Sequence, residues 1–446
     1  MAGLAAVSFA GFSLWLQSQA VQQMLYYPDI WFDGDPARVF GTMTSLATDS
    51  ERSSVHPLFP LFFGTPVLGL LGLGVEPQVA VSAAIATGAG GLGALFFLVA
   101  RQASGRVVDA AVYTMLLASS AAFIFWSAIP ETYDFGAVSL LLPLAIVCCP
   151  VGRWTPAAWV LSSALSLSVT VTNWSSGVLA AAVSLPWRRA ARLTIYAFAL
   201  VSALSVLQTY CFPRSGKFLD VNQESRYVKP LGIYQFEASL GLLLKGVVMP
   251  EVDLIQWRAR DSGTGSGIVN GYVSGVAFTT VPPSLKAASP LTLAGCAAWL
   301  LLLALAIGNA GRQLWRPTAA RPQRDDRDAP LADRSPGHRQ LYVAVAGLAL
   351  AQVSLHLVYG REPFLYSLHV TPLLVLLTVF LSRTPMRGLA LGLSVFIAVA
   401  GGSSNVERYL QATRFAAGLP SVSQPISKAG HVVDERTLSF KLLARF

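Results

Sequence analysis

The chain has 446 residues, of which 54% are hydrophobic and only 12% charged, and its mean hydropathy is +0.55. Soluble globular domains carry roughly a quarter of charged residues, so this composition excludes an ordinary soluble enzyme and predicts an all-α polytopic membrane protein. The formal net charge is +9. We do not expect a nucleic-acid partner, because much of the basic excess is arginine at the ends of apolar runs, where it sets topology.

The apolar runs predict about eleven transmembrane helices, since a hydrocarbon core of roughly 30 Å needs about 20 apolar residues. The first run lacks the basic flank and the small-residue cleavage motif of a signal peptide, so we expect it to be retained. The four cysteines have no metal-type spacing, and we expect neither disulfides nor cysteine chemistry. The predicted spans are 4–24, 79–100, 107–128, 135–149, 155–171, 175–185, 193–211, 291–308, 341–358, 366–381 and 389–400.

The loops between these spans alternate in charge. Those at 101–106, 150–154, 186–192, 311–340 and 382–387 are basic and are expected in the cytoplasm. Those at 130–134 and 172–177 contain no Lys or Arg and are expected on the outer side. The loop 359–364 also falls outside although it carries Arg361. This arginine runs against the topological trend and invites a functional explanation.

The stretch HPLFPLFFGTPVLGLLGLG, at 56–74, is apolar enough to cross but contains Pro57, Pro60 and Pro66. Proline removes a backbone donor and disfavours a regular helix, so we expect this stretch to lie along the outer interface or to re-enter. The amino terminus is then cytoplasmic and the carboxyl terminus outside. The alternative is a full crossing, which would put the preceding loop on the cytoplasmic side.

This topology divides the chain into four parts: an N-terminal module at 1–211 whose first outer loop is 28–78, an outer loop at 212–289, helices at 290–402, and an outer tail at 403–446. The outer loop contains aromatic residues and an amphipathic stretch at 232–249, so we expect it to be ordered with an interfacial helix. The cytoplasmic linker is 311–340, and its part 316–338, rich in Arg, Asp and Pro, is expected to be flexible. No internal repeat is visible, which disfavours a transporter built from two halves.

The first outer loop carries the acidic motif FDGDPARVF. Asp35 followed by Pro36 is typical of a helix start, because aspartate caps free amides and proline fits the first helical position. A helix cap at a membrane surface also turns its carboxylate toward anything that binds there. Asp33 has no such structural role, so both acids are candidates for chemistry.

The order of one helix, the motif FDGDPARVF and then SVHPLFPLF resembles the polyprenyl-phosphate-dependent glycosyltransferases of the GT-C fold, in particular the protein O-mannosyltransferase and aminoarabinose-transferase relatives. In those families the first outer loop carries an Asp-Glu pair, followed by a His-Pro-Pro or Lys-Pro-Pro element. Asp35 stands in the place of the first acid, and Pro36 departs from the usual Glu. Arg38 matches an arginine of some relatives, and His56-Pro57 matches the second element with Leu58 in place of its last proline.

A second part of the resemblance is YGREPFLYSLHVTPLLVLL, at 359–377, where these enzymes place a basic residue and an aromatic before a helix that contains a proline. The resemblance implies that Arg361 binds the donor phosphate with Tyr366, His56 and Arg38. A guanidinium suits that role because it pairs bidentately with phosphate oxygens. The alternative for Arg361 is an interfacial anchor beside Tyr366, and a lone histidine such as His369 is more often a packed residue than a catalytic one.

The loop PETYD adds Glu131 and Asp134 from the second outer loop. The resemblance implies that an acid of this loop reaches the active site. Together with Asp33 and Asp35 these carboxylates offer the oxygen ligands that Mg²⁺ or Mn²⁺ would take. The spacing alone does not choose between such a site and an ordinary polar loop.

The resemblance and the layout together predict an inverting glycosyltransferase in the cytoplasmic membrane, with its active site facing outward. Its partners would be a polyprenyl-phosphate-linked sugar, the membrane lipid, and a hydroxyl acceptor on a glycan, lipid or protein. Asp35 is the expected general base, with Asp33 as second choice. The alternatives are an oligosaccharide transferase of the same fold and a transporter or flippase for a lipid-linked sugar.

Overall fold

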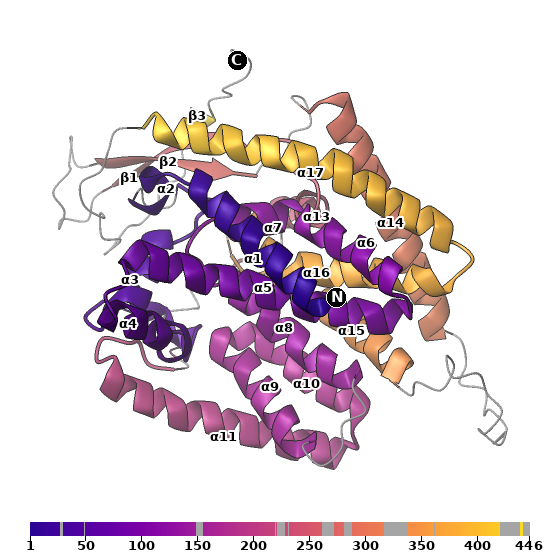
Figure 1. The fold of residues 1–446 in the computed structure, drawn as a ribbon, viewed down its shortest axis with the longest axis horizontal. Helices are drawn as coiled ribbons and strands as arrows, with labels where there is room; N and C mark the ends of the chain where they lie inside the picture. Colours follow the sequence, from indigo (N-terminus) through magenta and orange to yellow (C-terminus); the bar gives the residue numbers. More distant parts are fainter. Residues whose placement is uncertain are drawn as a thin grey trace.

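The computed structural model describes residues 1–26, 30–48, 50–148, 155–218, 220, 228–230, 232–260, 272–280, 288–315, 337–360, 362–419 and 438–439. It is predominantly helical (Figure 1). In chain order the helices are α1 (Ala2–Gln19), α2 (Gln22–Tyr26), α3 (Pro36–Thr44), α4 (Thr65–Gly72), α5 (Pro77–Ser104), α6 (Val107–Ala118), α7 (Ala121–Trp126), α8 (Tyr133–Cys148), α9 (Thr155–Val169), α10 (Trp174–Ser184), α11 (Trp187–Cys211), α13 (Ile233–Lys245), α14 (Pro290–Trp315), α15 (Gly337–His356), α16 (Ser367–Val379) and α17 (Arg387–Ala417).

Five helical stretches among the described residues are long and apolar enough to cross a membrane: Pro77–Ser104, Trp187–Cys211, Pro290–Gln313, Pro363–Arg383 and Arg387–Ala417. The helices pack closely where small residues face one another. A Cβ atom at Gly93 of α5 would lie 2.5 Å from the ring of Phe9 on α1. Such contacts allow helix backbones to approach in a lipid environment, where the hydrophobic effect does not drive helices together. The long apolar helices confirm the expectation of a helical, membrane-associated protein.

One end of the bundle gathers α3, α4 and a β-ribbon (Figure 1). Backbone hydrogen bonds tie the loops together there: the Val171 amide donates to the Val55 carbonyl and the Leu58 amide to the Ser168 carbonyl. The Trp126 indole donates to the Phe364 carbonyl, which brings the chain beyond α15 to the same place. We call this the acidic end, defined by residues 30–58, 127–134, 168–173 and 362–364. The parts of the predicted outer loops that the structure describes here therefore meet at one end of the bundle.

The opposite end joins predicted cytoplasmic loops and is called the basic end, defined by residues 101–109 and 381–387. The Arg383 guanidinium donates to the carbonyls of Ala103 and Gln102 at 2.7 and 2.9 Å. Arg387 forms a bidentate pair with Asp109 at 2.7 and 2.8 Å. The basic loops 101–106 and 382–387 thus lie together at one end, and the non-basic loop 130–134 lies at the other.

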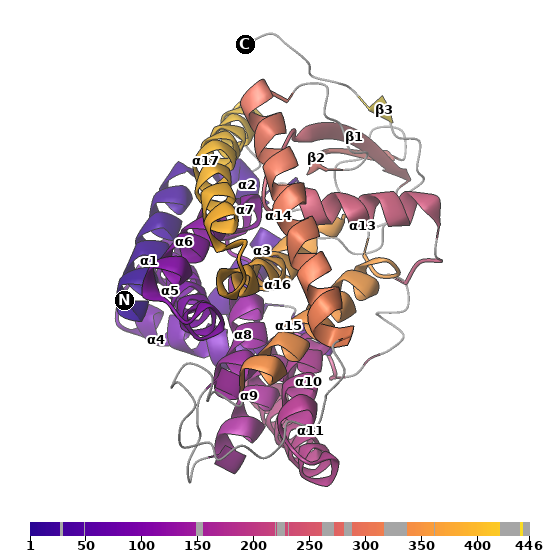
Figure 2. The ribbon, with the colours of Figure 1, turned by 90° about the vertical axis from the view of Figure 1, so that its right-hand side faces the viewer.

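The predicted outer loop 212–289 contains α13 and an antiparallel β-ribbon. The all-α prediction did not include the ribbon. Strands β1 (Asp253–Arg260) and β2 (Tyr272–Thr279) pair over their full length, and β3 (Leu438–Ser439) adds to the other edge of β1. Figure 2 shows α13 and the ribbon on one side of the bundle, with α9, α10 and α11 at the other. The Phe278 amide of β2 donates to the Ile30 carbonyl at 2.7 Å, which holds the ribbon beside the acidic motif.

Several predicted boundaries are wrong. The stretch 107–128 is not one helix, because the chain breaks at Ser119 and Ser120 between α6 and α7. The last helix does not end at 400 but continues to Ala417, since its charged residues lie on one face while Tyr409 and Ala412 are buried on the other. The stretch 60–72 forms a short π-helix (Pro60–Gly64) continued by α4, consistent with the expected disruption by proline. The predicted linker 311–340 is too long at both ends, because α14 continues to Trp315 and α15 begins at Gly337. Its remaining part, 316–336, lies outside the described residues.

Asn405 of α17 closes the break between α6 and α7. Its amide donates to the carbonyls of Ser119 and Val247 and accepts from the Met249 amide, each at 2.8 Å. The side chain is fully buried. An interrupted helix inside a membrane leaves backbone groups unpaired, and side chains of neighbouring helices must satisfy them. Asn405 performs this role for three groups on two segments.

We expect Asn405→Ala to lower the free energy of unfolding by about 2 kcal/mol, because each intramembrane hydrogen bond contributes roughly 0.6 kcal/mol and three are lost. Thermal unfolding of the purified protein in detergent measures this. Ser403→Ala is the matched control, since Ser403 is exposed and its hydroxyl bonds only to Val399 of its own helix. Equal stability of the two variants would contradict the role given to Asn405.

Candidate functional site

The acidic motif makes a tight left-handed turn at the acidic end. Phe32 and Asp33 have φ angles of +52° and +61°. This conformation is tolerated by aspartate but is a marked outlier for a bulky aromatic residue. Phe32 is held in it because its ring is fully buried and packs against Phe364, Phe125 and Trp126, with centroids 4.9 to 6.2 Å away. Strain of this kind persists where the surroundings determine the backbone, as is common at functional sites.

Gly34 follows the turn at a position with no room for a side chain. A Cβ atom there would lie 2.9 Å from the Trp31 carbonyl oxygen and 3.2 Å from the Glu131 carboxylate. The missing side chain allows Glu131 to approach the backbone, where its carboxylate accepts a short hydrogen bond from the Asp35 amide. The glycine of FDGDP therefore joins the first outer loop to the second.

Asp35 is the N-cap residue of α3 with Pro36 at the first helical position, as the sequence predicted. Its carboxylate makes no capping hydrogen bond, so the prediction that it caps free helix amides is wrong. The carboxylate instead accepts from the Arg38 guanidinium at 3.3 Å, and the two side chains are 27% and 23% exposed. Asp35 thus offers a partly accessible carboxylate whose charge Arg38 stabilises.

Glu131 is the buried partner of this pair and is only 3% exposed. Burial raises its pKa to about 7; Arg38 lowers that pKa and the Asp35 charge raises it further. Its second oxygen accepts from the Thr132 amide at 3.2 Å. Because its oxygens are occupied by backbone donors, Glu131 is suited to fixing Asp35 rather than to meeting a ligand.

Asp134 does not belong to this pair, contrary to the suggestion that the four acids share one site. Its carboxylate accepts from the Ser127 hydroxyl at 2.7 Å, and the residue is buried against Gly88 of α5. The separation arises because Glu131 precedes α8 while Asp134 lies in its first turn. Among the described residues, no three His, Cys, Asp or Glu side chains are grouped closely enough to hold a metal ion.

His56 packs against the end of α9, and its predicted part in binding a donor phosphate stays a prediction. Its Nδ1 atom lies 2.7 Å from the Val169 carbonyl oxygen at the end of α9. Burial, followed by the charge of Arg52, lowers the pKa of His56 to about 3. The imidazole is therefore neutral at physiological pH and cannot pair with a phosphate as a cation. The charges of Arg52 and Arg38 both act on His56 and lower its pKa.

The predicted late element is only partly described. Arg361 lies outside the described residues, so its role as a phosphate ligand stays a prediction. Tyr366 stacks on His356, with ring centroids 4.2 Å apart and an interplanar angle of 17°. Tyr133 interacts electrostatically with Tyr366, Asp35 and Glu131. Tyr133 was not among the predicted site residues. Its position between Glu131 and Asp134 in PETYD is the sequence feature that could have identified it.

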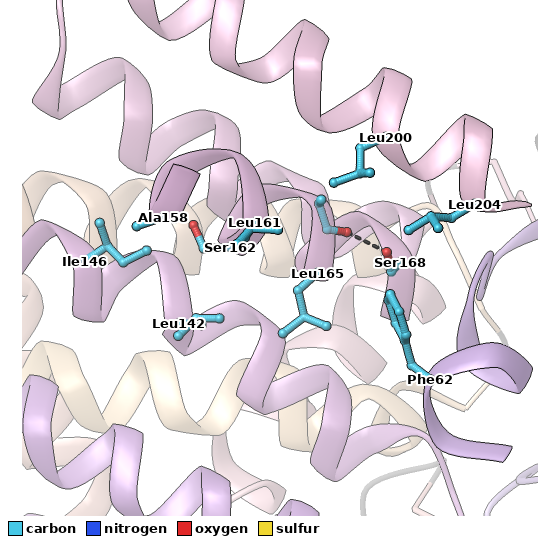
Figure 3. A pocket seen from close by; sticks show the side chains of 11 residues that line it. Phe62, Leu142, Ile146, Ala158, Leu161, Ser162, Leu165, Ser168, Leu200 and Leu204 are labelled. Carbon is cyan, nitrogen blue, oxygen red and sulfur yellow. Dashed lines mark hydrogen bonds between the residues drawn. The ribbon is translucent and has the colours of Figure 1, made fainter. Parts of the chain in front are cut away.

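An apolar groove of about 440 Å³ lies between α8, α9 and α11 and ends at Phe62 and Ser168 (Figure 3). Phe62 and Ser168 line one end, next to the Leu58 and His56 contacts with α9. Leu200 and Leu204 of α11 face Leu165 of α9 across it. The sequence could not identify this groove, because its walls come from helices that are distant in the chain. Its remaining lining residues are Leu142, Ile146, Ala158, Leu161, Ser162 and Ala164.

Comparison with known proteins does not assign the site, since no protein-family model, curated protein or solved structure matches the chain significantly. A function for this site is therefore inferred from its residues and their geometry.

The raised pKa of Glu131 predicts a pH-dependent stability. A carboxyl group whose pKa rises from 4.5 to about 7 on folding favours the folded state while it is protonated. That stabilisation is complete below pH 4.5 and is lost as the pH rises through 7, by up to about 3 kcal/mol. We expect the wild type to lose more stability than Glu131→Gln between pH 5 and pH 8 in denaturant titrations. Parallel curves for the two proteins would contradict the buried state of Glu131.

Proposed function

We propose that the chain is an inverting glycosyltransferase of the GT-C type, which moves a sugar from a polyprenyl phosphate to a hydroxyl acceptor at the acidic end of the bundle. The observation that carries this proposal is the pair formed by Asp35, partly accessible, and Glu131, buried, next to Arg38. The apolar groove ends at Phe62 and Ser168, next to the His56 contact with α9, and Arg38 acts electrostatically on His56. An acid paired with a cation, together with a lipid-sized apolar groove, is what a lipid-linked sugar donor requires.

In the proposed reaction the Asp35 carboxylate accepts the proton of the acceptor hydroxyl as its oxygen bonds to the anomeric carbon. The bond from that carbon to the phosphate oxygen breaks, and its electron pair leaves with the lipid phosphate. Arg38, which bonds to Asp35, is the cation placed to stabilise the developing negative charge. Glu131 is a positioning residue, because it holds the Asp35 backbone through the amide hydrogen bond.

The apolar groove supplies the place for the isoprenoid chain in this proposal. Its lining is almost entirely aliphatic and lies on the outer surface of the helices, where a lipid can enter sideways. Its end at Phe62 and Ser168 lies next to the His56 contact with α9. We further propose that the shorter apolar helices complete a multi-pass bundle of about eleven crossings, with the acidic end facing outward from the cytoplasmic membrane.

We expect Asp35→Asn to lower the rate of sugar transfer by about two to four orders of magnitude while leaving donor binding intact, because the amide cannot accept a proton. Transfer from radiolabelled polyprenyl-phosphate sugars to membrane-derived acceptors measures this, with Asp33→Asn in parallel. Glu407→Gln, an exposed change on α17, is the control. If the wild type binds the donor and moves it between leaflets without transferring the sugar, the transport alternative replaces the enzyme.

The groove assignment has its own test. Leu165→Trp should fill the groove and weaken the binding of a long polyprenyl-phosphate sugar by about tenfold, because apolar area of the chain stays in lipid or detergent instead. A donor with only two isoprene units should bind both proteins equally. Leu98→Trp, on an exposed face of α5, is the matched control. If Leu165→Trp weakens the binding of both the long and the short donor, the substitution does not act through the groove.

A further inference from the structure

A second apolar groove, separate from the one between α8, α9 and α11, lies between α6 and the start of α1. Both views of the fold show α1 and α6 apart from α11 (Figure 1, Figure 2). The proposed sugar transfer makes no use of this groove. Its volume is about 280 Å³, and its lining residues are Met1, Val107, Val108, Ala111, Val112 and Met115.

The lining residues of α6 form one stripe along the helix. They stand at positions 107, 108, 111, 112 and 115, and residues three and four apart share a face of a helix. Val108 and Met115 are 66% and 44% exposed, whereas Tyr113 on the opposite face is fully buried. Because a helix rises 1.5 Å per residue, the stripe is about 12 Å long. An exposed apolar stripe of this length can hold part of an acyl chain.

The groove begins at the basic end. The residues that define this end, 101–109 and 381–387, include four arginines and one aspartate, a formal charge of +3. The aspartate, Asp109, is fully buried and is already bound by Arg387. Arg106 directly precedes Val107 and is exposed. Within the described part of the chain its guanidinium forms no ion pair, so its charge is available to an anion.

The backbone fixes Arg106 at the start of the groove. The Ser104 hydroxyl donates to the Arg106 carbonyl at 3.0 Å and accepts from the Arg106 amide at 3.3 Å. Between them Gly105 has a φ of +78°, the left-handed conformation that ends α5. A Cβ atom at Gly105 would lie 3.4 Å from the Arg383 guanidinium. A second positive charge therefore lies beside the turn that carries Arg106 to the groove.

We propose that this groove and Arg106 form a binding site for one phospholipid with an anionic headgroup, in the leaflet at the basic end. An acyl chain lies along the α6 stripe, and the headgroup phosphate pairs with Arg106, because a guanidinium matches phosphate oxygens bidentately. The positive charge of this end favours phosphatidylglycerol over the zwitterionic phosphatidylcholine. A second copy of the chain suits the groove less, since a two-fold interface would bring the same arginines together.

Photoactivatable phosphatidylglycerol, with its reactive group in an acyl chain, tests the site on the full chain in nanodiscs. We expect cross-links within 107–115, located by mass spectrometry of the digested protein. Unlabelled phosphatidylglycerol should compete about fivefold better than phosphatidylcholine with the same acyl chains, because one arginine near an anionic lipid contributes about that factor. Arg106→Gln should remove this preference. Val108→Trp should fill the groove and abolish the cross-links.

Two matched controls separate a built site from general attraction to the membrane. Arg312→Gln removes the same charge from an exposed position in the last turn of α14 and should leave the preference unchanged. Leu300→Trp, at a position of α14 that is 49% exposed, should leave the cross-links unchanged. Thermal unfolding checks that each variant folds, and Met115→Trp at the far end of the groove replaces Val108→Trp if that variant does not.

Three results would overturn the proposal. If phosphatidylcholine competes equally with the wild type, the groove holds membrane lipid without selection. If Arg312→Gln lowers the preference as much as Arg106→Gln, surface charge alone attracts the lipid. If residues 107–115 cross-link to another copy of the chain instead of the lipid, the groove is a protein interface. The site does not depend on sugar transfer, so each of these results leaves the proposed function standing.

Discussion

The hydrogen bond from the Asp35 amide to the Glu131 carboxylate joins two loops that are 96 residues apart in the chain. It can form only because Gly34 leaves room for the carboxylate and because Phe32 and Asp33 adopt left-handed conformations. Each such residue costs roughly 1 to 2 kcal/mol, and burial of a side chain such as the Phe32 ring contributes a comparable amount, about 1.5 to 3 kcal/mol. The aromatic cluster around Phe32 thus stabilises the turn that aims the acid pair.

The left-handed turn at Phe32 and Asp33 is held in place by contacts at both ends of the bundle. At the basic end Arg383 and Arg387 bind the backbone and Asp109, and these contacts anchor α16 and α17 against α5 and α6. At the other end α7 carries Trp126 and leads directly to Glu131. Since α7 begins at the break that Asn405 closes, the hydrogen bonds of Asn405 contribute to the placement of an acid in the site.

The proposed chemistry follows from unequal environments of similar residues. Asp35 remains partly accessible beside Arg38, whereas Glu131 is buried and fixes the backbone. The apolar groove between α8, α9 and α11 is the kind of surface expected for a ligand with a long apolar tail. A transporter could bind the same ligand. The two functions differ in whether Asp35 accepts a proton from an acceptor hydroxyl.

The sequence by itself determined the helical membrane character, the separation of the basic loops 101–106 and 382–387 from the loop 130–134, and the start of a helix at Asp35 and Pro36, because these depend on local composition and backbone preference. It did not determine the break between α6 and α7, the β-ribbon, or the left-handed turn at Phe32. Nor did it distinguish Glu131 from Asp134, which share one short motif. Only the tertiary structure decided these features, because each depends on contacts between segments far apart in the chain: Asn405 with Ser119, Phe278 with Ile30, and Glu131 with Asp35.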